Sequence, residues 1–161
     1  MPIPPFIVDL RAKVGTDLLW LTGVTAVVLD DEDRVLLAQR ADSGRWALIS
    51  GVLEPGEQPA VAMVREIMEE TGVDAVVDVL YAVDVTDPVD YPNGDRSQYL
   101  DLLFLAHATG GEAYPADDES LAVGWFAMDA LPEGTGHHTA ERLAHLAAYR
   151  ADPASGTRFV R

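Results

Sequence analysis

Glu69 and Glu70 follow Glu66 by three and four residues in a stretch with helical periodicity. On a helical wheel with Glu66 at zero, Glu69 falls near −60° and Glu70 near +40°, so the three carboxylates share an arc of about 100°. Each like-charge pair at this spacing costs about 0.2–0.5 kcal/mol on an exposed helix. Mg²⁺ prefers such oxygen ligands and would neutralise the repulsion. The pattern predicts a metal site, and its alternative is an acidic stripe on a solvated helix.

The helix that carries these glutamates is expected over residues 58–71. Pro59 suits its first turn, where a missing N–H costs nothing, and Gly72 suits a left-handed C-terminal cap. Opposite the carboxylates lies an apolar stripe formed by Ala60, Val61, Val64, Ile67 and Met68. We expect this stripe to pack against the rest of the molecule.

The residues around the glutamates decide between the two interpretations. Gly51-Val-Leu-Glu-Pro-Gly-Glu57 is followed by seven residues and then by Arg65-Glu-Ile-Met-Glu-Glu-Thr-Gly-Val73. This segment resembles the Nudix box, Gly-x5-Glu-x7-Arg-Glu-U-x-Glu-Glu-x-Gly-U with U aliphatic, at every position. Many members of that family carry Pro-Gly directly before the box, whereas this chain has Ile49 and Ser50. This difference affects the geometry of the loop before the helix, but it does not change the residues expected to bind the metal.

The resemblance implies a hydrolase that uses Mg²⁺, with Mn²⁺ as a substitute. The implied metal ligands are the backbone carbonyl of Gly51 and the side chains of Glu66, Glu69 and Glu70. Arg65 and Glu57 would form an ion pair that holds the loop against the helix and orients the glutamates.

In this family a further acidic ligand or base often lies six residues before a Trp that begins a late strand. Glu119 precedes Trp125 by that interval. The alternative is that Glu119 is one of three surface acids, together with Asp117 and Asp118. The catalytic group expected from the resemblance consists of Arg65, Glu69, Glu70 and Glu119.

The expected reaction is cleavage of the diphosphate linkage in a nucleoside diphosphate derivative. Pro88 lies fifteen residues after Val73, as in family members that act on ADP-ribose, although a loop would carry Pro for turn formation alone. Tyr91 is a candidate for stacking on a base, and Arg40 and Arg96 are candidates for phosphate contacts. A hydrolase of nucleoside triphosphates is the alternative within the enzyme class. A nucleotide or ADP-ribose sensor without catalysis is the alternative outside it.

The remaining sequence indicates an α/β protein with helices at residues 6–14 and 139–149. Strands are expected at residues 18–29, 34–40, 76–85, 99–108 and 121–127. The resemblance implies a three-layer α/β/α sandwich around a mixed sheet, as one domain over residues 1–150, and residues 151–161 are expected to form a flexible tail. Trp20, Trp46 and Trp125 are expected in the core, and His137 and His138 at the surface or capping the last helix.

Composition narrows the classes of partner. The formal net charge of −16 opposes binding to nucleic acid, and it means that a phosphorylated substrate needs bridging cations. The absence of Cys excludes disulfides, zinc thiolate sites and cysteine nucleophiles. No signal peptide or membrane helix is expected, which favours a cytoplasmic location. The expected partner is a small nucleotide, and a homodimer is a further expectation from the resemblance.

Overall fold

The computed structural model describes residues 3–160 and contains three α-helices within that range. These are α1 (Pro5–Val14), α2 (Pro59–Thr71) and α3 (His137–Ala151), with a short 3₁₀ turn η1 (Pro153–Ser155) after α3. The strands are β1 (Leu19–Leu29), β2 (Arg34–Arg40), β3 (Trp46–Ala47), β4 (Ile49–Val52), β5 (Val73–Val85), β6 (Val89–Asp90), β7 (Arg96–Gly111), β8 (Ser120–Ala127) and β9 (Arg158–Phe159). Every helix and strand expected from the sequence is present, although β5 and β7 extend beyond their predicted bounds.

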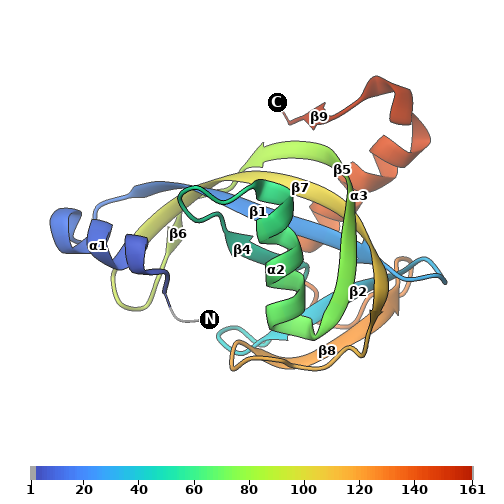
Figure 1. Cartoon of the computed structure of the whole chain (residues 1–161), viewed down its shortest axis with the longest axis horizontal. Coiled ribbons are helices and arrows are strands. Elements are labelled where there is room, and N and C mark those ends of the chain that lie inside the picture. Colours follow the sequence, from blue (N-terminus) through green and yellow to red (C-terminus); the bar gives the residue numbers. More distant parts are fainter. Residues whose placement is uncertain (1–2, 161) are drawn as a thin grey trace.

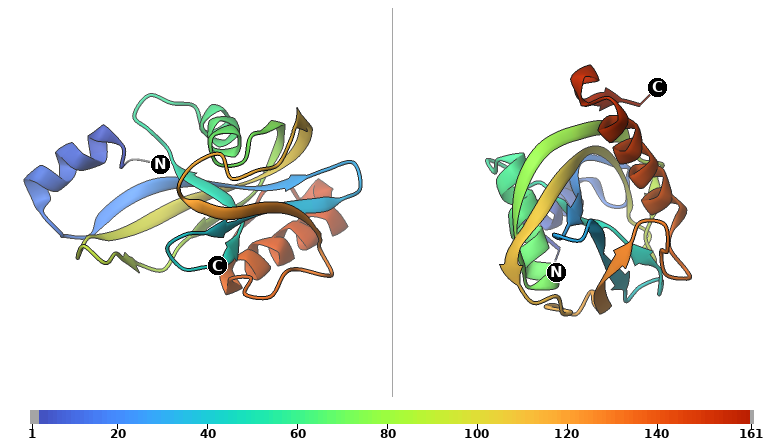
Figure 2. Two further views of the ribbon diagram at one scale, coloured as in Figure 1. Left: turned by 90° about the horizontal axis from the view of Figure 1, so that it is seen from below. Right: turned by 90° about the vertical axis from the view of Figure 1, so that its right-hand side faces the viewer.

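All of these strands belong to one mixed sheet with the main order β3-β2-β1-β7-β5-β9. β1 runs parallel to β7 along its whole length and antiparallel to β4, while β5 runs antiparallel to β7. The sheet is strongly curved, and α2 and α3 lie on its opposite faces (Figures 1 and 2). The predicted α/β/α sandwich around a mixed sheet is confirmed.

β1 forms the centre of the molecule because its side chains are buried on both faces. Val24, Ala26 and Val28 belong to the core under α2, whereas Val27 and Leu29 belong to the core under α3. The sequence of a strand that is buried on both faces is a nearly continuous run of apolar residues, because neither face is exposed to water and polar residues do not alternate with apolar ones.

The orientation of α2 differs from the prediction, although its ends do not. Pro59 begins the helix, and Gly72 ends it in the left-handed region at φ 68° and ψ 10°. Val61 and Met68, which were expected to pack, are 60% and 39% exposed. The buried side of the helix is formed by Ala62, Met63, Glu66, Ile67 and Thr71. The helix is thus turned so that Glu66 faces the body of the protein, Glu70 is partly buried and Glu69 is exposed.

The structure also bears on the predictions for Trp20 and for the residues after α3. The prediction that Trp20 lies in the core is wrong, because its side chain is 57% exposed near the start of β1. After α3 the chain forms η1, and β9 then pairs with β5 in parallel, so the tail has secondary structure. Flexibility of this tail and the domain boundary at residue 150 stay predictions.

None of the helices within residues 3–160 is both long and apolar enough to cross a membrane.

Candidate active site

A cavity of about 350 Å³ opens between α2, α1 and the central strands β1, β4 and β7. One wall carries the carboxylates of Glu66 and Glu70 of α2 and of Glu119, next to Gly51 of β4. Its size is in the range of small-molecule sites. Two of the predicted metal ligands on α2 and Glu119 from the loop before β8 therefore line the same cavity.

Glu66 is buried although it is ionisable, with 1% of its side chain exposed. Its Oε1 accepts a hydrogen bond of 3.1 Å from Arg65, while its Oε2 is buried and has no hydrogen-bond partner among residues 3–160. Burial raises the pKa of Glu66 to about 7, against the opposing effect of Arg65. An unpaired carboxylate oxygen in the interior is costly, so a ligand that neutralises it would stabilise this arrangement.

Glu70 lies one turn further along α2 and is partly buried beside the same cavity. Its pKa is raised to about 8, mainly by burial and in addition by the negative charges of Glu66, Asp117 and Glu119. Arg40 acts in the opposite direction. Several carboxylates thus share a poorly hydrated space, which is the situation that a cation relieves.

Gly51 packs directly against the Glu66 carboxylate. A Cβ atom added to Gly51 would overlap the Cδ and Oε1 atoms of Glu66. The glycine of the motif is therefore required by this close approach, and its φ is not in the left-handed region.

Gly51→Ala is expected to displace the Glu66 carboxylate and to weaken divalent-cation binding by about 10- to 100-fold, as loss of ligand positioning commonly does. Isothermal titration of the variant with Mg²⁺ and Mn²⁺ measures this effect. Gly56→Ala, in the loop that follows β4, is a matched control, since an added Cβ there meets no atom within 4 Å, although its φ of 87° costs some stability. Equal cation affinities for Gly51→Ala and the wild type would contradict this role of Gly51.

The predicted ion pair between Arg65 and Glu57 is present and is bidentate. Arg65 Nε and Nη2 donate to the two carboxylate oxygens of Glu57 at 2.9 and 3.0 Å. Nη1 of the same guanidinium contacts Glu66 at 3.1 Å and Glu69 at 3.2 Å. Arg65 therefore joins the loop after β4 to two of the predicted ligands, and the pairing lowers the pKa of Glu57.

Glu69 is the predicted ligand that the structure does not bring to the cavity. Its side chain is 47% exposed and turns towards Arg65. Its assignment as a metal ligand stays a prediction.

The structure brings together some of the predicted substrate contacts. Arg40 and Tyr91 line the cavity. Arg40 also forms a bidentate ion pair with Asp42 at 3.0 and 2.7 Å. Arg96 does not line the cavity, because its guanidinium pairs with Asp90 at 2.9 Å. Its role in substrate binding stays a prediction.

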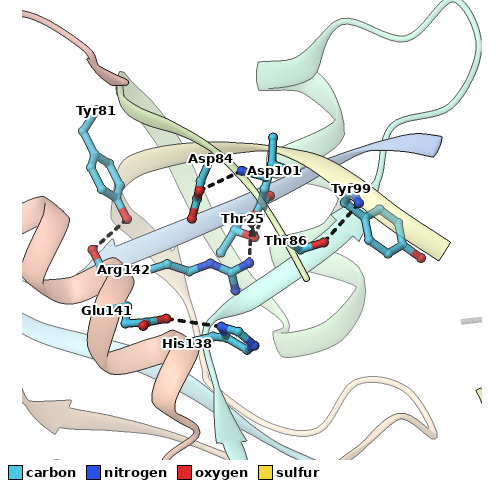
Figure 3. A network of polar contacts seen from close by, with 10 residues as sticks. Thr25, Tyr81, Asp84, Thr86, Tyr99, Asp101, His138, Glu141 and Arg142 are labelled. Carbon is cyan, nitrogen blue, oxygen red and sulfur yellow. Dashed lines mark hydrogen bonds and ion pairs between the residues drawn. The ribbon is translucent and has the colours of Figure 1, made fainter. Parts of the chain in front are cut away.

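A buried polar group beside the cavity was missed by the sequence analysis. Asp101 of β7 is 2% exposed and accepts hydrogen bonds from Thr25 of β1 at 3.0 Å and from Arg142 of α3 at 2.5 Å (Figure 3). All three residues also line the cavity. Its position in the sequence could have indicated a buried polar site, because Asp101 is a charged residue inside the apolar strand predicted over residues 99–108.

His137, His138 and Glu141 lie outside the cavity, at the exposed first turn of α3. Within the described residues they are the one group of three or more His, Asp or Glu side chains whose ligand atoms all lie within 4.8 Å of one another. The surface position expected for the two histidines is confirmed, and neither caps α3.

The donor set of the cavity fits a hard divalent cation. It offers the unpaired Oε2 of Glu66, the carboxylate of Glu70 and the backbone of Gly51 at a position that only a glycine can occupy. Oxygen ligands of this kind suit Mg²⁺ or Mn²⁺ and do not suit softer metals.

A family model described as the NUDIX domain matches residues 20–146, so the chain belongs to the Nudix family. The chain is 34% identical over 151 residues to the human 8-oxo-dGDP phosphatase NUDT18, covering 90% of this chain and 42% of that protein. It is 37% identical over 127 residues to a MutT-like protein of Streptomyces ambofaciens, covering 79% of this chain and 71% of the relative. The chain thus spans less than half of the human relative.

Solved structures show the same fold. An ADP-ribose pyrophosphatase from Streptococcus suis is 28% identical, with a TM-score of 0.63 over 86% of this chain and 96% of that chain. A UDP-X diphosphatase has a TM-score of 0.65 and 23% identity over 97% of this chain and 74% of that chain, which shows a shared fold alone.

Proposed function

We propose that the protein is a Mg²⁺-dependent hydrolase that cleaves the diphosphate linkage of a nucleoside diphosphate derivative. The observation that carries this proposal is the buried Glu66 carboxylate, with one oxygen unpaired, against Gly51 and beside Glu70 at the wall of a cavity. Arg40 lies on the same cavity and supplies positive charge for a phosphate group.

The chemistry divides among residues of this chain. Glu66, Glu70 and the Gly51 carbonyl would hold the cation, and Arg65 with Glu57 keeps Glu66 in place. A bound divalent cation supplies Lewis acidity towards the phosphoryl oxygens and lowers the pKa of water. Water attacks one phosphorus and gives up a proton, and the P–O bond to the bridging oxygen breaks. The products are a nucleoside monophosphate and the second phosphate, either free or still attached to its sugar, and the bridging oxygen stays on the phosphate that was not attacked.

The proton of the attacking water needs an acceptor within hydrogen-bond reach. Glu119 and Glu70 both line the cavity and are the candidates for this general base. Arg40 would orient the phosphate that is attacked, and the expected contribution of such positioning is large because it removes translational and rotational freedom.

Two substrates are favoured by specific observations. The spacing of Pro88 from Val73 and the likeness to the Streptococcus suis ADP-ribose pyrophosphatase favour ADP-ribose. The human relative that covers 90% of this chain is named an 8-oxo-dGDP phosphatase, which favours an oxidised guanine nucleotide. Nucleoside triphosphates stay an alternative, as does a sensor that binds without cleavage.

Turnover of ADP-ribose, 8-oxo-dGDP, dGDP and dGTP in the presence of Mg²⁺ tests the proposal, with products separated by chromatography. We expect a nucleoside monophosphate from at least one of the diphosphates, and no product after EDTA treatment. Nucleotide binding without any Mg²⁺-dependent turnover would favour the sensor instead. Release of pyrophosphate from dGTP alone would favour the triphosphate hydrolase.

A further inference from the structure

α1 precedes the segment that matches the family model, which begins at residue 20, yet it contributes to the cavity. We define the α1 wall as Ile3 and Pro4, which directly precede the helix, together with Ile7 and Arg11 of α1. In Figures 1 and 2, α1 lies at one end of the sheet, apart from α2. Two walls with different chemistry therefore border one cavity, since α2 provides carboxylates and α1 provides mainly aliphatic side chains.

Arg11 makes polar contacts that connect α1 to the start of β7. No residue of α1 is fully buried, and its apolar residues Phe6, Ile7 and Leu10 are partly buried. The Arg11 side chain is only 13% exposed, and its Nε lies 3.5 Å from Asp95. Its two terminal nitrogens donate to the backbone oxygens of Gly15, Asp17 and Arg96 and to the hydroxyl of Ser97. One guanidinium thus ties α1 to the start of β7.

These bonds also determine what the α1 wall can bind. A guanidinium has five N–H donors, and four of those in Arg11 are directed at protein oxygens. Asp95 adds a negative charge close by. A phosphate therefore gains little at this wall, whereas an uncharged group can contact Ile3, Pro4 and Ile7.

Two tyrosines add aromatic surface to the same cavity. Tyr91 and Tyr99 both line it, and their hydroxyls are joined by a hydrogen bond of 2.8 Å. Tyr91 belongs to the same connection as Asp95, to which α1 is attached through Arg11. Aromatic and aliphatic side chains around a small volume suit a flat ring system such as a nucleobase.

We propose that the α1 wall is the binding site for the nucleobase of the substrate and that Arg11 is the residue that positions this wall. The inference rests on the proposed function in assuming that the substrate is a nucleotide. The diphosphate lies at the carboxylates of α2 with its cation, and the base lies against Ile3, Pro4 and Ile7. Selectivity among nucleotides then depends on a helix outside the segment matched by the family model.

Three variants test this proposal. Arg11→Gln removes the attachment of α1, and Ile7→Ala removes part of the wall without changing the attachment. Lys13→Gln is the matched control, because it removes one positive charge from an exposed position on the same helix. We expect Arg11→Gln and Ile7→Ala to weaken GDP and ADP-ribose binding by about tenfold or more, and Lys13→Gln to leave it unchanged. Binding of inorganic pyrophosphate with Mg²⁺ is expected to be equal in all four proteins.

Amide hydrogen exchange gives a readout that does not depend on turnover. In the wild type, GDP or ADP-ribose is expected to slow exchange in residues 5–14, and inorganic pyrophosphate is not. Faster basal exchange of this segment in Arg11→Gln, with unchanged exchange in α2, is also expected. Unchanged nucleotide affinity in both test variants, or an equal loss for pyrophosphate, would overturn the proposal. A wild type that shows these binding effects but hydrolyses nothing would refute only the proposed function.

Discussion

Glu70→Gln is expected to lower kcat by about 10²- to 10⁴-fold, the range for loss of a group that acts in proton transfer or charge stabilisation. Glutamine keeps the size of the side chain but cannot carry the negative charge that the cation requires. The measurement is steady-state turnover of the best substrate at saturating Mg²⁺. Glu112→Gln, which makes the same chemical change at an exposed position, is the control and should retain full activity.

The same variant is expected to be more stable than the wild type when metal is removed. Burial raises the pKa of Glu66 to about 7 and that of Glu70 to about 8, from the ordinary glutamate value of 4.5. A carboxyl whose folded-state pKa is raised stabilises the fold fully below its unfolded pKa and loses that contribution as the pH rises through the folded pKa. In EDTA, the wild type should therefore lose stability between about pH 4.5 and 8.

Glu70→Gln removes the Glu70 part of this loss. At pH 8 in EDTA the variant should be more stable by about 1–2 kcal/mol, which is less than the full pKa shift implies because Glu70 is partly exposed. At pH 4.5 the two proteins should unfold at nearly the same temperature. Thermal unfolding at both pH values, with and without Mg²⁺, provides the comparison. A variant that is both active within tenfold of wild type and no more stable at pH 8 would show that Glu70 has neither role.

Arg142→Met is expected to lower the free energy of unfolding by about 3–5 kcal/mol at pH 7, as is typical when one partner of a buried ion pair is removed. The reason is that Asp101 would remain in the interior with only the Thr25 hydroxyl as a hydrogen-bond donor. Burial already raises the pKa of Asp101, and loss of Arg142 would raise it further. The destabilisation should therefore be smaller at pH 5, where more of Asp101 is protonated, than at pH 8.

Urea unfolding of the single and double variants tests the coupling. Arg142→Met combined with Asp101→Asn should recover part of the lost stability, because the buried charge of Asp101 is then also removed. Arg150→Met serves as the control, since Arg150 pairs with the exposed Asp33 at 3.0 Å and such surface pairs contribute about 0–1 kcal/mol. Similar losses in Arg142→Met and Arg150→Met would argue against a special role for the Asp101 pair.

The sequence alone determined the features that depend on local structure. Pro59 and Gly72 set the two ends of α2, because proline tolerates the first helical turn and glycine tolerates the left-handed cap. The spacing within residues 51–73 placed Glu66, Glu70 and Gly51 in one site and paired Arg65 with Glu57. These residues are joined by a short loop and a single helix, so their arrangement follows from nearby positions in the chain.

Only the tertiary structure determined which side of α2 is buried and which residues far apart in the chain come into contact. α2 carries apolar residues at several angles, and only contact with the sheet selected Met63 and Ile67 for burial and left Val61 and Met68 exposed. Asp101 meets Arg142, 41 residues away, and Arg11 meets Arg96, 85 residues away. Such pairings arise when strands and helices are stacked, and no spacing along the chain predicts them. The motif therefore located the carboxylates, whereas folding built the cavity that surrounds them.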